Sequence, residues 1–279
     1  MKGKLYTVLV VLLLLVGSGI LLYPTVSDAW NARLQAEAIR QYAQEVELLE
    51  TERHRELLET AKEYNAALAD RADGFSLPED LAQRYATVLS AGEDGILAYV
   101  EIPSLSVMLP IARGTDEKTL QKYVGHLEWT YLPIGGESTH SVISAHRGLP
   151  SAELFTHIDR LQPGDRFYIH VLGETLEYKV DNIAVVEPQD TTLLGMVPGQ
   201  DYVTLLTCTP YGINSHRLLV RGTRVAREAG TEAEVTVPVE TGPDFMLLIP
   251  AVVALIAAAV VIFLILDSRK GKGGKYETK

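Results

Sequence analysis

The residues with the clearest chemical potential in this chain are one cysteine and the histidines and arginines that could activate it. Cys208 is the only cysteine in 279 residues, so no disulfide forms within the chain and cysteine-rich zinc sites are excluded. It ends the apolar run Tyr202–Cys208 and precedes the turn residues Pro210 and Gly212. A thiol at a strand end beside a turn is reachable by substrate and held by a rigid sheet, which suits a nucleophile.

A cysteine needs an imidazole or a cation close by to act as a thiolate at neutral pH. The candidate partners are His146, His140, His126, His216 and Arg217. His146 has the best pattern, because the apolar run that starts at Ser141 ends on it just before a glycine turn. Arg217 begins the run after the Cys208 turn, and a hairpin-like return brings these two ends together. Spacing alone leaves open the alternative that Cys208 is a passive buried residue.

After Ile96 the sequence consists of short apolar runs separated by turn residues, which is typical of an all-β sandwich or barrel. The predicted strands are 98–102, 107–111, 140–144, 167–171, 175–187, 202–208 and 217–225. The runs between Phe167 and Val186 indicate a hairpin around Gly173 and Glu174, and Ser151–Leu161 is predicted as a helical insertion. No internal repeat is visible, which argues against a propeller or a solenoid.

The residues before Ile96 predict helices. From Trp30 to Asp70 apolar residues recur every three or four positions, which predicts an amphipathic helix in one long or two shorter pieces. Turn-forming residues then return between Asp70 and Gly95. We interpret that stretch as a connecting segment that covers part of the domain.

Two apolar runs have the length needed to cross a bilayer, Leu5–Leu22 and Phe245–Leu266. Basic residues lie before the first run and after the second, so the positive-inside rule predicts cytoplasmic termini and an outward-facing segment from about 24 to 243. The alternative for the first run is a cleaved signal peptide, and for the second a buried core helix.

The chain carries a net charge of −11, and its acidic residues are concentrated between the two apolar runs. Binding to nucleic acid requires a basic surface, and none is visible outside the tails. We therefore expect no nucleic acid partner.

The segment around Cys208 resembles the signature of the sortases, in which Thr-Leu-x-Thr-Cys is followed some residues later by an arginine. It stands here as Thr204-Leu-Leu-Thr-Cys208 with Arg217 downstream. The resemblance covers roughly 96–225 and continues through four further stretches, 125–130, 132–136, 144–150 and 208–219. It is closest to class C, the pilin-polymerising sortases, which also tend to have two membrane spans and a helical N-terminal region.

The resemblance implies an all-β fold, an eight-stranded β-barrel with an N-terminal helical region and two transmembrane helices. It also implies a catalytic site of Cys208, His146 and Arg217, with no metal or cofactor. Cys208 would attack the threonine carbonyl of a Leu-Pro-x-Thr-Gly-like sorting signal, His146 would move protons, and Arg217 would stabilise the oxyanion. His126 and Thr207 are expected to flank the substrate site.

The implied substrates are pilins or surface proteins with a C-terminal sorting signal, and the thioacyl group then passes to an amine. A pilin lysine is the favoured acceptor, and the alternative is a cell-wall precursor amine, as in a housekeeping sortase. A non-catalytic membrane-tethered β module that binds wall proteins is the alternative outside the enzymes.

Class C sortases often carry a lid whose Asp-Pro-aromatic motif plugs the site. The nearest counterpart here is Asp73-Gly74-Phe75. Glycine replaces the proline that would fix φ, so the entropic cost of ordering this loop rises. The alternative is a plain turn in which Phe75 packs against the core. Asp28-Ala29-Trp30 has similar spacing but lies close to the first apolar run, and we interpret Trp30 as an interfacial residue.

These inferences predict six segments. They are a cytoplasmic tail and first membrane helix at 1–23, an extracytoplasmic helical region with the candidate lid at 24–95, the catalytic barrel at 96–226, a tether at 227–243, a second membrane helix at 244–267, and a basic cytoplasmic tail at 268–279.

Overall fold

The computed structural model of the protein describes residues 2–69, 77–92, 95–225 and 256. Its strands are β1 (Ile96–Ile102), β2 (Val107–Arg113), β3 (Val124–His126), β4 (Thr139–Ser144), β5 (Arg166–Val171), β6 (Glu174–Val186), β7 (Asp201–Thr209) and β8 (His216–Arg224). Its helices are α1 (Lys2–Glu47), α2 (Thr51–Ala69), α3 (Glu79–Tyr85) and α4 (Glu117–Leu120), with 3-10 turns η1 (Pro103–Leu105), η2 (Ile158–Arg160) and η3 (Thr192–Leu194).

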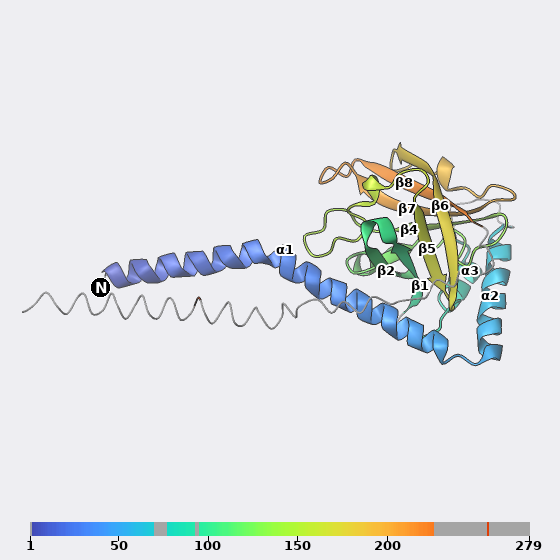
Figure 1. The fold of residues 1–279 in the computed structure, drawn as a ribbon, viewed down its shortest axis with the longest axis horizontal. Coiled ribbons are helices and arrows are strands. Elements are labelled where there is room, and N and C mark those ends of the chain that lie inside the picture. Colours follow the sequence, from blue (N-terminus) through green and yellow to red (C-terminus); the bar gives the residue numbers. More distant parts are fainter. Residues whose placement is uncertain (1, 70–76, 93–94, 226–255, 257–279) are drawn as a thin grey trace, which may run out of the picture. The chain divides into compact units, whose positions relative to one another are not determined.

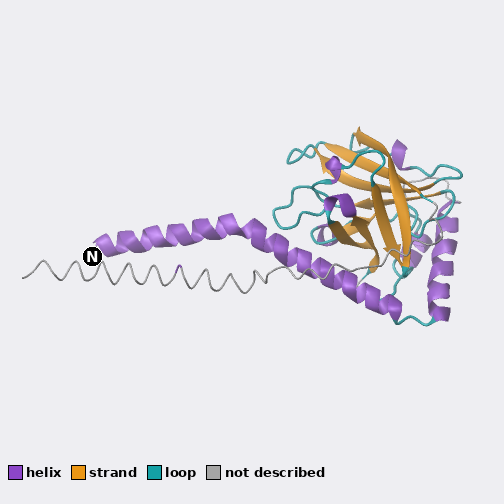
Figure 2. Cartoon of the chain, viewed as in Figure 1, coloured by secondary structure: helices purple, strands orange, loops and turns teal. Residues whose placement is uncertain are grey.

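The eight strands close into a barrel in the order β1-β2-β3-β4-β7-β8-β6-β5, and β5 pairs back to β1 (Figure 1; Figure 2). Closure removes the free sheet edges that an open sheet would expose. The predicted eight-stranded barrel preceded by a helical region is thereby confirmed. β2 with β3 and β4 with β7 are parallel pairs, and the other pairs are antiparallel.

The pairing around β7 determines which residues meet at one end of the barrel. β4 and β7 run in the same direction with Ser144 opposite Leu206, so their C-terminal ends lie side by side. β8 runs antiparallel to β7 and therefore begins at that same end. Successive side chains of a strand face opposite sides. Val203 and Leu205 belong to the main hydrophobic core, whereas Leu206 packs in a separate cluster on the outer face.

The N-terminal helices bury their apolar faces on the barrel. Leu57 and Tyr64 of α2 and Leu81 of α3 belong to the same hydrophobic cluster as the barrel interior, and Figure 1 shows both helices beside the strands. Tyr42 of α1 lies in a second cluster on β1, donates a hydrogen bond to the Leu97 carbonyl at 3.0 Å, and accepts one from the backbone of Leu172 at 2.9 Å.

The helical stretch predicted after Trp30 forms two helices that break between Glu47 and Thr51, and the first of them extends back to Lys2. The predicted hairpin is present, but its turn lies one residue earlier than expected, at Leu172 and Gly173, both with positive φ. Contacts from outside the hairpin hold this position, because Tyr42 binds the Leu172 backbone N–H.

The helical insertion predicted at Ser151–Leu161 is wrong. The segment forms turns, a bridge between Leu149 and Ala152, and the short 3-10 turn η2. Leu154 has a φ of 41°, which interrupts a right-handed helix. Phe155 is fully buried, so packing against the barrel outweighs local helix propensity here.

Within the described residues, no helix is both long and apolar enough to cross a bilayer. The predicted first span lies in α1, and the predicted second span lies outside the described residues except for Ile256. Both spans stay predictions. The barrel forms one compact unit with the helical residues from Ser27 onward, and the described residues before Ser27 group apart from it.

Candidate active site

The three predicted catalytic residues lie in one row across β4, β7 and β8. Cys208 of β7 is paired directly with Arg217 of β8. In the parallel pair of β4 and β7, Ser144 is opposite Leu206. His146 follows Ser144 by two residues, and Cys208 follows Leu206 by two residues. Cys208 and Arg217 are register partners and share the outer face of the barrel, and continuing the β4–β7 register past its last pair puts His146 beside them on that face.

Three hydrogen bonds join the chain on either side of His146 to the chain on either side of Cys208. The Ala145 N–H donates to the Leu206 carbonyl at 3.1 Å, and the Thr207 hydroxyl donates back to the Ala145 carbonyl at 2.8 Å. Nη1 of Arg147 donates to the Thr209 hydroxyl at 3.0 Å. Histidine and cysteine are therefore each fixed by both neighbours, which is the preorganisation that proton transfer between them requires.

Arg147 is in turn fixed by an ion pair. Its Nη2 lies 2.5 Å from Oδ2 of Asp159 in η2, and its side chain is only 10% exposed. The loop that replaces the predicted helix thus supports the site. Neither Arg147 nor Asp159 was predicted to support the site, although Arg147 directly follows His146 in the chain.

Cys208 is half-buried and forms no disulfide. Arg217 donates through Nη1 to the carbonyls of Asn214 at 3.4 Å and His216 at 3.1 Å. No ion pair joins Arg217 to a carboxylate in the described part of the chain. Arginine has five N–H donors, so this guanidinium keeps donors for a substrate oxygen beside Cys208.

The turn after β7 packs over the turn that follows His146. Gly148 has a φ of +76°, and a Cβ built on it would lie 2.7 Å from the ring of Tyr211. Any larger residue at position 148 would be strained and would also displace the tyrosine. The β7–β8 turn and the histidine segment are therefore held together beside the row of three residues.

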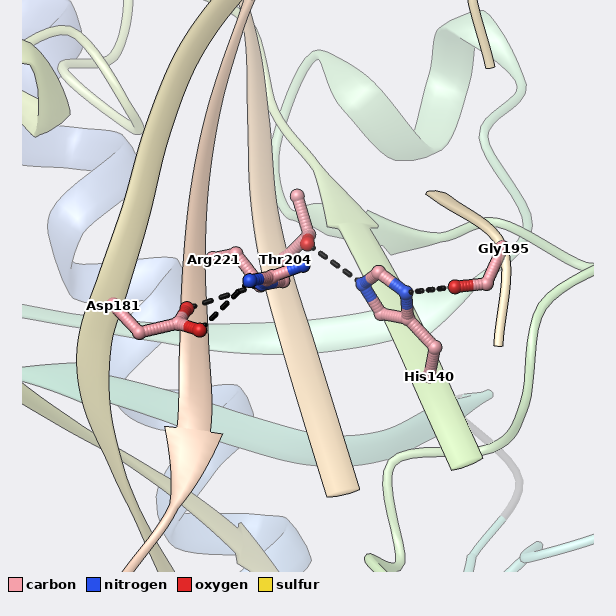
Figure 3. Close-up of polar contacts among 5 residues, drawn as sticks. All are labelled: His140, Asp181, Gly195, Thr204 and Arg221. Carbon is pink, nitrogen blue, oxygen red and sulfur yellow. Dashed lines mark hydrogen bonds and ion pairs between the residues drawn. The ribbon is translucent and has the colours of Figure 1, made fainter. Parts of the chain in front are cut away.

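His140 (Figure 3), another candidate partner, is buried on the same outer face opposite Tyr202, which lies six residues along β7 from Cys208. Its Nδ1 donates to the Gly195 carbonyl at 2.9 Å, so its Nε2 accepts from the Thr204 hydroxyl at 2.7 Å. Burial lowers the pKa of His140 and keeps the ring neutral. His140 fastens the β6–β7 connection, 187–200, to the sheet.

Beside this histidine, Arg221 makes a two-bond ion pair with Asp181 at 3.0 and 2.8 Å (Figure 3). Its guanidinium also lies over the Tyr202 ring, 4.1 Å from the ring centroid. Asp181 and Tyr202 are thus the partners of the Arg221 side chain. It supports the strands beneath the row of three residues rather than offering donors to a ligand.

His216 pairs in register with Thr209, so it faces the opposite side of the sheet from Cys208. Its Nε2 lies 3.2 Å from Oε1 of Glu187. Thr207 is buried and faces the interior, where its hydroxyl holds the Ala145 carbonyl. Thr207 therefore supports the site through the residue that precedes His146.

His126 is fully buried on β3 and does not lie in the row of Cys208. Its Nε2 donates to the Tyr131 carbonyl at 2.8 Å, so Nδ1 accepts from the Tyr85 hydroxyl at 2.9 Å. Burial, reinforced by the nearby charge of Arg113, lowers the pKa of His126 to about 4. His126 joins α3 to the barrel through Tyr85, and because it is fully buried it does not face the row of Cys208.

The candidate lid residues Asp73 and Phe75 lie outside the described residues. Asp28, the alternative that appeared too close to the first apolar run, reaches the loop after His146, because its Oδ1 accepts from the Glu153 N–H at 2.9 Å. Trp30 is 49% exposed. Among the residues that the structure describes, no group of three histidine, cysteine or acidic side chains is arranged to hold a metal ion.

The fold and these motifs match known proteins. The sortase domain matches residues 100–225. Sortase C1 of Streptococcus agalactiae is 43% identical with a TM-score of 0.67, and the alignment covers 69% of this chain and all of that one. Sortase C of Clostridium perfringens, solved with a C-terminal cell wall sorting motif, is 44% identical with a TM-score of 0.61, covering 68% of this chain and 99% of that one.

A third similar structure is sortase C of Streptococcus pneumoniae, described with regard to catalysis and pilin substrate specificity. It is 43% identical with a TM-score of 0.61, and the alignment covers 70% of this chain and all of that one. Identity at this level over nearly the whole of each relative, on the same fold, establishes the relationship. The chain therefore belongs to the sortase family of cysteine transpeptidases, and its similarity to class C members is the best supported within that family.

Proposed function

We propose that this protein is a membrane-anchored pilin sortase whose catalytic residues are Cys208, His146 and Arg217. The observation that carries the proposal is the single row of these residues at the ends of β4 and β7 and the start of β8. A nucleophile, a proton carrier and a fixed cation are the three groups that acyl transfer through a thioester needs.

In the proposed reaction, the thiol proton of Cys208 passes to His146, and the sulfur attacks the threonine carbonyl of the sorting signal. The guanidinium of Arg217 stabilises the negative oxygen that develops, because it is always cationic and keeps donors available. When the tetrahedral species collapses, the peptide C–N bond breaks and His146 gives its proton to the leaving amine. An incoming lysine amine then loses a proton to His146 and displaces the sulfur.

An apolar rim supports peptide binding at this site. The two segments joined directly to β7, the 187–200 connection before it and the β7–β8 turn after it, carry five exposed large apolar side chains. They are Leu193, Met196, Val197, Tyr211 and Ile213. Exposed apolar clusters of this kind mark interaction surfaces, and a sorting signal offers leucine and proline side chains to such a rim.

The choice of a pilin lysine over a wall amine rests on the class C relatives, one of which is described in terms of pilin substrates. Incubation of the full-length chain with a pilin that carries a sorting signal should give a ladder of covalent multimers. Cys208→Ala should give neither the ladder nor the thioacyl adduct seen by intact-mass spectrometry. Transfer only to a wall-type amine would replace the pilin assignment with wall anchoring, and transfer by the Cys208→Ala variant would end the assignment of the nucleophile.

The membrane anchor and the outward-facing barrel are part of the proposal, supported by the two apolar runs and by the basic tails. Because Cys208 is the only cysteine, a small charged thiol reagent that cannot cross membranes tests the location directly. Intact protoplasts should be labelled on Cys208 without lysis, and cells carrying Cys208→Ala should not be labelled. Labelling that requires lysis would place the barrel in the cytoplasm.

We also propose that Asp73-Gly74-Phe75 covers Cys208 in the absence of substrate. Phe75→Ala should then speed alkylation of Cys208 by a small neutral reagent, whereas Trp30→Ala serves as the matched aromatic control and should not. Equal alkylation rates in the two variants and in the unmodified chain would remove the lid.

A further inference from the structure

His146 carries a buried polar atom that the mechanism so far leaves without a partner. Its Nε2 is buried and makes no hydrogen bond within the described residues, although 29% of the side chain is exposed. Buried polar atoms in native proteins nearly always have a partner, and an exception needs an explanation. The carboxylate that approaches this atom is Glu117, whose Oε2 lies 3.9 Å from Nε2.

Glu117 is held in place by its own helix. Asp116 caps α4, and its Oδ1 accepts from the backbone N–H groups of Lys118 at 3.0 Å and Thr119 at 3.3 Å. One helical turn later, Nε2 of Gln121 donates to Oε1 of Glu117 at 3.0 Å. With one oxygen bound by Gln121, the other oxygen is the one that faces His146.

We propose that Glu117 is a positioning residue for His146: it accepts the Nε2 proton and thereby leaves Nδ1 as the nitrogen that exchanges protons with Cys208 and with the substrate amine. This inference rests on the proposed transpeptidase mechanism. A small rotation of the ring or of the carboxylate closes the 3.9 Å separation to hydrogen-bond distance, and catalytic hydrogen bonds that are long in the free enzyme often tighten when substrate binds.

The proton balance assigns each nitrogen one task. The proton from the Cys208 thiol goes to Nδ1 of His146, which makes a thiolate and an imidazolium. Nδ1 later delivers that proton to the leaving amine and takes one from the incoming amine. The Nε2 proton stays shared with Glu117 throughout, so the carboxylate fixes the ring orientation and stabilises the imidazolium without being protonated.

The size of the effect is limited by solvent. The Glu117 side chain is 71% exposed, so its attraction to an imidazolium is screened and weakens as salt is added. We expect Glu117→Gln to lower kcat about two- to fivefold at low salt, with little change in KM. Gln121→Leu, which releases Oε1, should lower kcat in the same direction but less.

The decisive measurement is the tautomer of the His146 ring in the full-length chain, observed by nitrogen NMR after histidine-selective labelling. Seven histidines contribute, and a His146→Gln spectrum assigns the signal. At about pH 9, where histidines are neutral, the unmodified chain should show the Nε2–H form, and Glu117→Gln should show a mixture of tautomers. Glu174→Gln, an exposed carboxylate in the β5–β6 hairpin, is the control and should change neither tautomer nor kcat.

An unchanged tautomer together with an unchanged kcat in Glu117→Gln would overturn the role of Glu117. The same conclusion follows if Glu174→Gln lowers kcat equally, because the loss would then reflect net charge. The NMR measurement needs no sorting substrate, so it separates the two proposals: absence of transfer with any amine refutes the proposed function, and the tautomer still reports on Glu117.

Discussion

Protonation of His126 should destabilise the fold at mildly acidic pH. This ring is fully buried on β3, donates to the Tyr131 carbonyl and accepts from the Tyr85 hydroxyl. A second proton would enter at Nδ1, which removes the acceptor for Tyr85 and puts a positive charge in the interior near Arg113. Burial, with a smaller contribution from Arg113, accordingly lowers the pKa from 6.5 to about 4.

The sign and the size of the effect follow from linkage. The folded state binds this proton less readily than the unfolded state, so the stabilisation is complete above the unfolded pKa of 6.5 and is lost as the pH falls towards about 4. One pKa unit corresponds to about 1.4 kcal/mol. Between about pH 7.5 and about pH 5 the loss from His126 alone should be about 2 kcal/mol.

Urea unfolding of the full-length chain at these two pH values, compared with His126→Gln, measures this contribution. Glutamine can donate to the Tyr131 carbonyl but cannot become charged. Burial also lowers the pKa values of His140 and His170, and their contributions cancel in the comparison. The unmodified chain should lose about 2 kcal/mol more than the variant. Two curves that fall in parallel would show that His126 is protonated without cost, and the reasoning from burial would be wrong.

Three further predictions concern single hydrogen-bonding groups. Thr207→Val leaves the Ala145 carbonyl without its hydrogen-bond donor, so the free energy of unfolding in urea should fall by about 1–3 kcal/mol and kcat should fall as well. An unchanged kcat would show that this hydrogen bond does not align the site. Tyr42→Phe removes both hydrogen bonds of the Tyr42 hydroxyl, one of them from Leu172, so the free energy of unfolding should fall by about 2–4 kcal/mol. Proteolysis between α1 and α2 should become faster, and the same rate of proteolysis in the variant and the unmodified chain would argue against docking of the helix on the barrel. Arg217→Lys keeps the charge but loses the planar donors; it should lower kcat at least about tenfold, and full activity would reduce the arginine to a simple cation.

Much of the fold was predictable because its signals are local. Apolar runs bounded by turn residues predict strands from side-chain alternation alone, and seven of the eight strands were found in this way. β3 was missed because its three residues are too few to show a pattern. The Leu172–Gly173 turn and the loop at Ser151–Leu161 were misjudged because contacts with residues far away in the sequence decide their backbone.

The candidate catalytic residues could also be named from the sequence, because the segments around Cys208, His146 and Arg217 resemble the sortase motifs, whereas spacing alone left Cys208 open as a passive buried residue. Their supporting residues could not. Arg147 depends on Asp159, and Glu117 depends on Gln121 for its direction toward His146. Each is an ordinary charged residue in the sequence, and only its neighbours in space distinguish it.

By itself, the sequence determined which reactive groups are available: the thiol of Cys208, the imidazole of His146 and the guanidinium of Arg217. Each lies at the end of an apolar run, in an acidic domain between two longer apolar runs. The tertiary structure decided which of five candidates stands beside Cys208. The parallel pairing of β4 with β7, separated by more than fifty residues of chain, puts His146 in that row and gives His140 and His126 other partners. Such pairing arises from closing the barrel and burying its core, which depends on all strands at once and leaves no mark in a local stretch of sequence.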